Sequence, residues 1–301
     1  MTVVQLECFL AVARTRHFGR AAENLGRTQP ALSVQVQRLE AALGAALFER
    51  TARHIRLTTA GEILVPYAER ILADVDESRT KIQDVRGGNL GVLRIGVLPT
   101  VAAHFVPVVM AVFKKRCEGV TVILREESRT DQLVPLVQSG EIDLTIARRP
   151  PASAGLKSRA VLTEELCLAV SRKHPLAQTL SVNPSQLSSE RFILYKSPLH
   201  STREMTLQFC RDAGFEPKVE FESEQAHTIQ NLVAANLGVT LLPEMVLRNQ
   251  TVSDLMMVRI QPPAPTRTLV VSWKAGRYLS ATARKFIGIA EKVGRKWQDQ
   301  H

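Results

Sequence analysis

The hydrophobic periodicity of the chain changes once, near residue 90, and this change separates two parts that must fold differently. Before it, apolar residues recur every three or four positions, which is typical of helices that bury one face. After it, short apolar stretches alternate with helical segments. With 301 residues the chain has room for two or three domains. We therefore expect a helical N-terminal part followed by an α/β part.

Residues 1–58 have the pattern of three helices followed by a short β-hairpin. A tight turn at Gly26-Arg27 precedes the third apolar stripe. Thr28 can cap the helix that follows, and Pro30 stands near its start, where a missing N–H costs nothing. The basic stretch at 47–57 suits two short strands. This order of elements predicts a winged helix-turn-helix.

A long helix is expected at residues 59–90, between the two parts. Thr59 and Glu62 have the spacing of a capping box. Pro66 should kink the helix or loosen its first turns, and Gly87-Gly88 should end it. Alternating steps of four and three predict that the helix pairs with another chain through Leu64, Ala68, Ile71, Val75, Ser78, Ile82 and Val85.

From residue 91 to 301, alternating strands and helices imply mostly parallel sheets with helices on both faces. Two such sets fit two lobes with a cleft between them. The expected strands are 93–97, 120–125, 142–147, 166–170, 192–195, 219–221, 239–242, 257–260 and 269–273. The expected helices lie near 101–116, 130–139, 202–213, 224–236 and 281–293.

The helix that starts at Thr28 has the side chains needed to read base edges in a major groove. Gln29 and Ser33 stand one turn apart on its polar side; glutamine can pair with adenine through two hydrogen bonds, and serine donates or accepts. Gln37 and Arg38 lie farther along and are expected to meet phosphates. In the wing, phosphates or a minor groove are the expected targets of Arg50, Arg53, His54 and Arg56.

The segment from Phe18 to Gly61 resembles the LysR-type transcriptional regulators. The matches include the Ala21-Ala22 pair, the run Gln29 to Ser33, and Leu47-Phe48, all in order and spacing. The resemblance extends over essentially the whole chain, including the segment 227–244. One position departs from it: many relatives carry a basic residue where this chain has Val34, which removes a possible contact with DNA.

The resemblance implies a bacterial regulator whose Gln29, Pro30 and Ser33 face bases and whose Arg53 lies near the minor groove. It implies that the long helix pairs the subunits, and that the resulting homodimers assemble into homotetramers that bend promoter DNA. It also implies a type 2 periplasmic-binding-protein fold after the linker, with a small effector between the lobes. Regulators of this kind usually activate a neighbouring operon, which makes RNA polymerase an expected partner.

By the same resemblance, lobe I comprises 91–163 and 268–301, and lobe II comprises 164–267. Thr100, Ser201 and Thr202 then fall at the effector cleft. Arg148 follows an expected strand and can pair with a carboxylate, so we expect a small anionic metabolite, such as an organic carboxylate. Alternatively, the three hydroxyl residues only cap helices, with Ser201 and Glu204 at capping-box spacing, and Arg148 is solvated.

The net charge of +10 favours polyanionic partners, although most of the excess lies after residue 88 and so does not locate a DNA site. No run of about 18 uncharged apolar residues is present, and Met1 to Ala13 lacks the basic start of a signal peptide. We therefore expect a cytoplasmic protein without a membrane segment. A solute-binding protein would share the two lobes but would lack the N-terminal module.

Two further alternatives are a redox sensor and an enzyme. The segment 200–215 resembles the one that carries two reactive cysteines in the family's peroxide sensors; Cys210 matches the second, but Ser201 stands in place of the first. Without that thiol, the intramolecular disulfide cannot form there. No Ser/His/Asp or paired-carboxylate constellation, phosphate-binding glycine motif or metal motif is evident, so we expect neither enzymatic activity nor a cofactor or metal.

Overall fold

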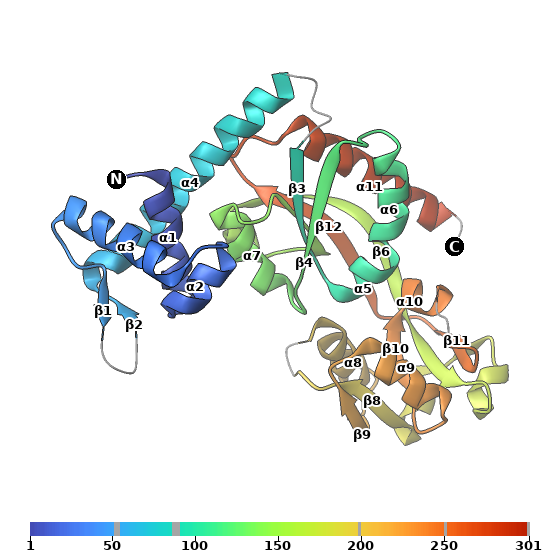
Figure 1. Cartoon of the computed structure of the whole chain (residues 1–301). Coiled ribbons are helices and arrows are strands. Elements are labelled where there is room, and N and C mark those ends of the chain that lie inside the picture. Colours follow the sequence, from blue (N-terminus) through green and yellow to red (C-terminus); the bar gives the residue numbers. More distant parts are fainter. Residues whose placement is uncertain (51–54, 86–90, 198–199, 250–251, 300–301) are drawn as a thin grey trace. The chain divides into compact units, whose positions relative to one another are not determined.

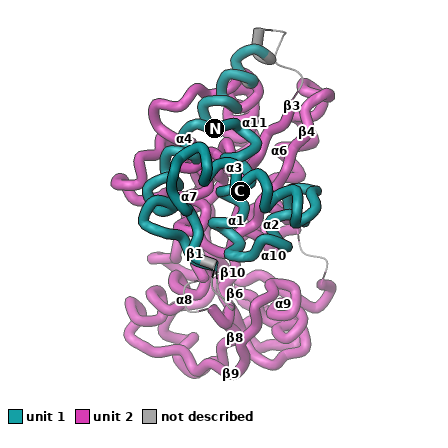
Figure 2. The backbone as a smooth tube through the Cα atoms, turned by 60° about the vertical axis from the view of Figure 1, so that its left-hand side comes forward, with its two compact units in different colours: residues 1–86 teal, residues 87–301 magenta. Residues whose placement is uncertain are grey.

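The computed structural model describes residues 1–50, 55–85, 91–197, 200–249 and 252–299 (Figure 1). The chain forms two compact units, residues 1–86 and residues 87–301, shown in teal and magenta in Figure 2. Within the described residues, no helix combines the length and the apolar character that a membrane span requires.

Unit 1 is the expected three-helix domain with a wing. Thr28 caps α3 as predicted, because its Oγ1 accepts a hydrogen bond from the Ala31 amide at 3.4 Å. The rings of Phe9 and Phe18 lie 5.5 and 5.9 Å from that of Phe48, so the wing is packed into the helical core. The elements are α1 (Val3–Thr15), α2 (Phe18–Asn24), α3 (Gln29–Leu43), β1 (Phe48–Arg50), β2 (Ile55–Leu57) and α4 (Thr59–Val85).

The start of the long helix α4 differs from its prediction. Its cap is Thr58 and not Thr59, since the Gly61 amide donates to Thr58 Oγ1 at 3.1 Å. Pro66 lies inside the helix but does not end it.

The expected pairing stripe on α4 is also only partly free. Ala68 is buried in the core of unit 1, and Leu64 and Ile71 pack against that core. The first half of the stripe was therefore wrongly assigned to another chain, because it covers the unit's own α1 and wing. The large apolar side chains that α4 exposes are Ile63, Tyr67 and Ile82.

Unit 2 is a two-lobed α/β structure with one eight-stranded sheet in the order β4-β3-β5-β12-β6-β11-β7, in which β10 also pairs with β6. Strands β8 and β9 pair beside it. The strands are β3 (Gly91–Val97), β4 (Val120–Glu126), β5 (Leu144–Arg148), β6 (Leu156–Ser171), β7 (Ser181–Val182), β8 (Arg191–Tyr195), β9 (Lys218–Ser223), β10 (Thr240–Pro243), β11 (Leu255–Ile260) and β12 (Thr266–Lys274).

The helices of unit 2 match the expected segments closely, except that the first is split in two at Phe105 and that the short helix at Glu244–Arg248 was not expected. They are α5 (Pro99–His104), α6 (Val106–Lys114), α7 (Thr130–Ser139), α8 (Ser201–Asp212), α9 (Ala226–Ala234), α10 (Glu244–Arg248) and α11 (Ala281–Asp299), with short 3-10 turns at Ala152–Ala154, Pro175–Gln178 and Pro184–Ser189.

The sequence predicted only the second half of β6. The observed strand is 16 residues long and belongs to both lobes: it pairs with β12 up to Glu165 and with β10 from Leu166 onward. Its first half was missed because charged residues interrupt its apolar pattern. The expectation of mostly parallel pairing is also wrong here, because β12, β10 and β11 all run antiparallel to β6. Parallel pairs occur at β3–β4, β3–β5, β7–β11 and β8–β9.

Helix α11 lies directly against the backbone of β6. A methyl group at Gly294 would overlap the carbonyl oxygen of Val161, so only glycine permits this approach. The rings of Phe113 in α6 and Phe286 in α11 meet edge to face with centroids 5.5 Å apart. These two contacts fix α11 against both the sheet and α6.

Candidate functional site

The exposed side of α3 carries the residues that the sequence assigned to DNA. Leu32, Val36 and Leu39 are fully buried and turn the opposite side of the helix into the core. Ser33 is half-buried. The remaining predicted contacts of this helix are exposed: Thr28, Gln29, Pro30, Gln37 and Arg38. The helix therefore offers a polar surface of short and medium side chains at its N-terminal half.

Gly19 in the preceding helix lies beside both His17 and Gln29. A methyl group at Gly19 would lie 3.0 Å from His17 Cε1 and 3.4 Å from Gln29 Oε1. His17 is itself fixed, because its Nδ1 accepts a hydrogen bond from the Arg20 amide at 3.2 Å and caps α2. The Gln29 side chain therefore lies next to α2, and the tight approach at Gly19 is to His17.

The wing is joined to α3 by a carboxylate whose role the sequence did not reveal. Glu40 Oε1 accepts hydrogen bonds from the amides of Leu47 and Phe48 at 2.8 and 3.3 Å. Arg56 is exposed on β2. Arg53 and His54 lie outside the described residues, and only the backbone of Arg50 is described, at the end of β1.

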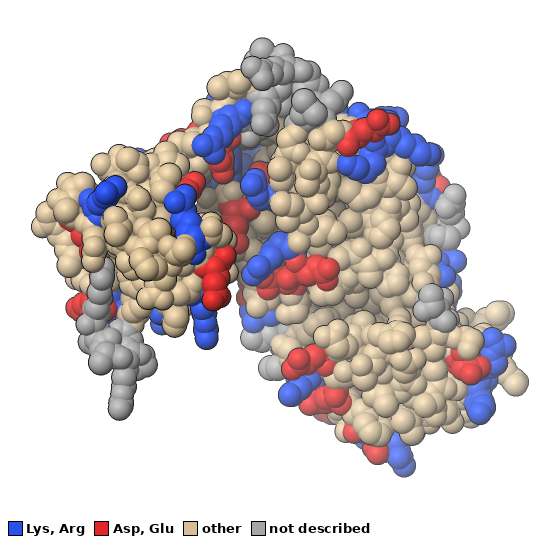
Figure 3. Space-filling model, viewed as in Figure 1, with Lys and Arg blue, Asp and Glu red and all other residues tan. Residues whose placement is uncertain are grey.

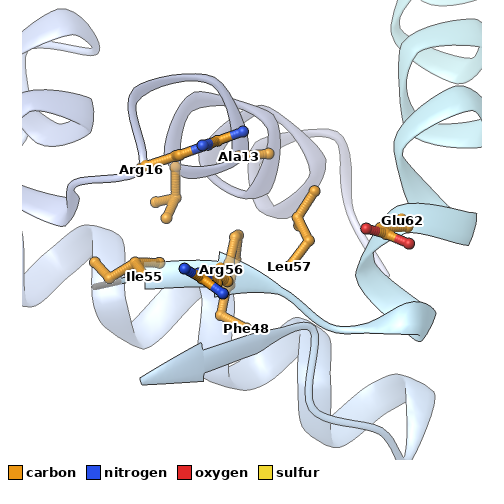
Figure 4. A pocket seen from close by; sticks show the side chains of 8 residues that line it. Ala13, Arg16, Phe48, Ile55, Arg56, Leu57 and Glu62 are labelled. Atoms are coloured by element: carbon orange, nitrogen blue, oxygen red, sulfur yellow. The ribbon is translucent and has the colours of Figure 1, made fainter. Parts of the chain in front are cut away.

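A pocket of about 340 Å³ lies where α1 ends beside the wing strands and the start of α4 (Figure 4). None of the α3 residues assigned to bases lines it. Its lining is Val12, Ala13, Arg16, Phe48, Ile55, Arg56, Leu57 and Glu62. The pocket is therefore separate from the α3 surface.

In unit 2, a buried ion pair joins β6 and β12 where the two strands pass from one lobe to the other. Arg267 donates from Nε and Nη2 to Glu164 Oε1 at 2.9 and 2.7 Å. Glu164 Oε2 accepts from the amide of Met245 at 2.8 Å. Arg267 Nη1 donates to Thr100 Oγ1 at 3.2 Å. Glu164 and Arg267 are only 5% and 3% exposed, so the pair acts at low dielectric.

The positive charge of Arg267 contributes to the pKa shifts of two histidines and a tyrosine. The rings of Tyr195 and His200 are stacked with centroids 3.6 Å apart. Burial first, and then the positive charge of Arg267, lowers the pKa of His200 to about 4 and also lowers the pKa of His104. Both imidazoles are therefore neutral near pH 7.

Tyr195 supplies a hydrogen-bond donor that the described residues leave unused. Its side chain is 4% exposed, and its hydroxyl has no hydrogen-bond partner among the residues that the structure describes. Burial raises the pKa of Tyr195 to about 12, so the hydroxyl keeps its proton. A buried polar group of this kind is costly unless something accepts its hydrogen bond.

The start of α8 brings Ser201 and Thr202 next to this group. Both are buried, at 7% and 4% exposure. The capping residue is His200, whose Nδ1 accepts from the Thr202 amide at 3.3 Å, so the predicted capping box of Ser201 and Glu204 is wrong. Its physical reason is that the imidazole fills the capping position one residue earlier.

Arg148 has a partner that neither interpretation of the sequence anticipated. It is the last residue of β5, and its Nη1 lies 3.6 Å from Oε2 of Glu204. Both side chains are largely exposed, so the pair is weak. The guanidinium buried next to Thr100 is that of Arg267, while Arg148 sits in a surface ion pair.

Cys210, the candidate redox cysteine, lies in an environment that makes its thiol unreactive. The thiol of Cys210 is fully buried, and burial raises its pKa to about 12. The same holds for Cys167. Because the thiolate is the reactive form, a pKa this high disfavours oxidation by peroxide.

Comparisons with known proteins agree with this two-part organisation. The family model "Bacterial regulatory helix-turn-helix protein, lysR family" matches residues 3–62, and the model "LysR substrate binding domain" matches residues 86–295. A curated relative, the "Hydrogen peroxide-inducible genes activator" of Haemophilus influenzae, is 30% identical over 92% of this chain and 91% of its own length.

Two solved structures share the fold over nearly their whole length. A full-length OxyR variant from Pseudomonas aeruginosa superimposes with a TM-score of 0.74 and 26% identity, covering 98% of this chain and 95% of that one. Full-length CbnR in complex with its target DNA gives a TM-score of 0.70 at 24% identity, covering 97% and 100%.

Proposed function

The chain belongs to the LysR family of DNA-binding transcriptional regulators. From this we propose a function for each of its two units. Unit 1 binds a palindromic promoter site through α3 and the wing. Unit 2 binds a small effector, and this binding changes how the protein bends the promoter DNA. Members of the family are regulators and not enzymes, so the polar cluster around Arg267 is assigned to binding.

The observation that carries the DNA proposal is the exposed polar side of α3. Gln29 and Ser33 are assigned to base edges, which the burial of Leu32 on the other side supports. Pro30 is assigned to the bases as well, whereas Thr28, Gln37 and Arg38 are assigned to positioning on the DNA backbone. The wing residues assigned to phosphates or a minor groove are Arg50, Arg53 and His54.

We divide the chain into a DNA-binding domain (1–58), a linker helix (59–90) and an effector domain (91–301). The lobes are 91–163 with 268–301, and 164–267. Exposed Ile63, Tyr67 and Ile82 on α4 support pairing of two chains. In this proposal the chain forms homodimers, or homotetramers built from them. The protein acts in the cytoplasm, with RNA polymerase as a partner.

The effector site that we propose lies where the polar cluster surrounds Arg267. Thr100, Ser201 and Thr202 keep their assigned roles, and Arg267 takes the role that the sequence gave to Arg148. The unused donor of Tyr195 favours an acceptor such as a carboxylate, and Arg267 Nη1, which donates to Thr100 and not to Glu164, supports an anion beside it. A small organic carboxylate fits these requirements.

The DNA proposal is tested with the protein's own upstream promoter fragment. The double variant Gln29→Ala/Ser33→Ala should bind that fragment at least about 30-fold more weakly, because each of the two lost base contacts costs roughly 1–3 kcal/mol. Its binding to unrelated DNA should stay the same. Fluorescence anisotropy at several salt concentrations measures both affinities.

The matched control is Arg38→Ala, which removes a phosphate contact from the same helix. It should weaken binding to every sequence alike and reduce the slope of log affinity against log salt by about 1. If the double variant kept full selectivity for the promoter fragment, α3 would not be the element that reads the bases.

The effector proposal is tested by calorimetry against a panel of small carboxylates. For a carboxylate that binds, Tyr195→Phe should weaken affinity by roughly tenfold or more, because it deletes one hydrogen bond to a charged group and preserves the packed ring. Arg148→Ala should leave the affinity within about twofold, since an exposed pair contributes little. The reverse order of the two variants would return the anchoring role to Arg148.

A further inference from the structure

Unit 2 has a groove between α6 and α11 that the proposed effector site does not use. Its volume is about 350 Å³, within the range of small-molecule pockets. Its floor is apolar and comes from both helices: Val108 and Val112 stand one turn apart on α6, and Val293 and Trp297 one turn apart on α11.

The groove is held open by the packing beneath it. The edge-to-face contact of Phe113 and Phe286 fixes the distance between the helices. Val108 and Val112 are 43% and 37% exposed, which is unusual for valines on a well-packed helix. The apolar floor is therefore preformed and open to solvent.

Three cations surround this floor: Arg116 after α6, and Lys292 and Lys296 on α11. Along the described parts of the chain, none of the three has a carboxylate within 4 Å, and no acidic residue lines the groove. Neighbouring cations behave differently; Arg159, for example, lies 3.7 Å from Glu291. In Figure 3, Lys and Arg side chains, with some acidic ones among them, gather at the upper right of the view, where α6 ends in front of α11.

We propose that this groove is a second ligand site, which binds an organic carboxylate with an aromatic or branched apolar body. The body lies on the valines and against the indole of Trp297, and the carboxylate lies between Arg116 and the two lysines. Burial of the body drives binding, and the cations set the orientation and the preference for an anion.

Other occupants fit the groove less well. A second copy packed around a twofold axis at this groove would bring two sets of the same three cations together, which opposes association. Nucleic acid would use the cations but would leave the apolar side chains of the groove without a partner. A small amphipathic anion uses both features.

The test uses naphthalene-2-carboxylate and the full-length protein, with binding followed by calorimetry. The double variant Lys292→Gln/Lys296→Gln should weaken the affinity roughly tenfold. Neutral naphthalene-2-carboxamide should bind the unchanged protein at least about tenfold more weakly than the carboxylate. The matched control is Arg295→Gln, an exposed cation on the same helix that does not line the groove; it should leave the affinity within about twofold.

Several results would overturn the proposal. The first is an absence of binding up to about 1 mM, or binding that the double variant leaves unchanged. The second is binding that Tyr195→Phe abolishes while the groove variants keep it, which would place the probe at the effector site. The third is a change of oligomeric state in the double variant by sedimentation, or a loss of nonspecific DNA binding in it, because either would assign the groove to a macromolecule.

Discussion

Replacing Glu164 by alanine is expected to lower the free energy of unfolding of unit 2 by about 3–5 kcal/mol. The substitution leaves the guanidinium of Arg267 buried without its counter-charge, and it removes the acceptor of the Met245 amide. Denaturant unfolding followed by tryptophan fluorescence reports on this unit alone, because both tryptophans, Trp273 and Trp297, lie in it.

The neighbouring carboxylate provides a matched control. Glu165 pairs with Arg259 at 3.2 Å, but both side chains are about 40% exposed, at 39% and 41%. Glu165→Ala should therefore lower the free energy of unfolding by less than about 1 kcal/mol. The double variant Glu164→Met/Arg267→Met should recover much of the loss, since two apolar side chains replace the pair. Equal costs for Glu164→Ala and Glu165→Ala would show that the buried pair contributes nothing special.

A second large effect is expected from Gly294→Ala in α11. The added methyl group would overlap the carbonyl oxygen of Val161, so α11 must move away from β6. Overpacking of this kind lowers the free energy of unfolding by about 1–3 kcal/mol, and a rigid backbone oxygen as the obstacle favours the upper end. Thermal unfolding followed by the same fluorescence measures the loss.

Gly288 offers the control within the same helix. A methyl group there meets no atom within 4 Å, so Gly288→Ala should raise the free energy of unfolding by up to about 1 kcal/mol through helix propensity. Opposite signs for the two substitutions separate tertiary contact from intrinsic propensity. If Gly294→Ala were also stabilising, α11 would not lie against β6 as described.

Elements governed by local chemistry could be predicted from the sequence. Thr28 and Pro30 mark the start of α3 because capping depends only on residues within one turn. The cap of α4 was displaced by one residue because two threonines stand side by side, and Thr58 is the one that bonds to the Gly61 amide. The long strand β6 was missed because charge on its first half hides a strand whose partners lie far away in the sequence.

In the proposed effector cluster, too, residues marked by local sequence could be predicted, whereas contacts between distant residues could not. Thr100 and Thr202 could be singled out because both lie near helix starts, and the family resemblance assigned them to the proposed effector cleft. Glu164 and Arg267 are 103 residues apart, and no spacing rule connects them. The available clue to their pairing was that Glu164 and Arg267 are charged and stand where the chain was expected to pass between the lobes. Arg148 was chosen instead because it follows an expected strand, and its surface partner Glu204 is too distant in the sequence to be anticipated.

The shared strand β6 has a consequence for the behaviour of unit 2. Along its second half, Cys167 and Ala169 face one hydrophobic core, while Leu166, Leu168 and Val170 face another. Neither core can unfold without removing β6 from the other core. We therefore expect the two lobes to unfold in a single step. A movement of one lobe relative to the other on ligand binding would have to twist β6, because this strand runs without a break through both lobes.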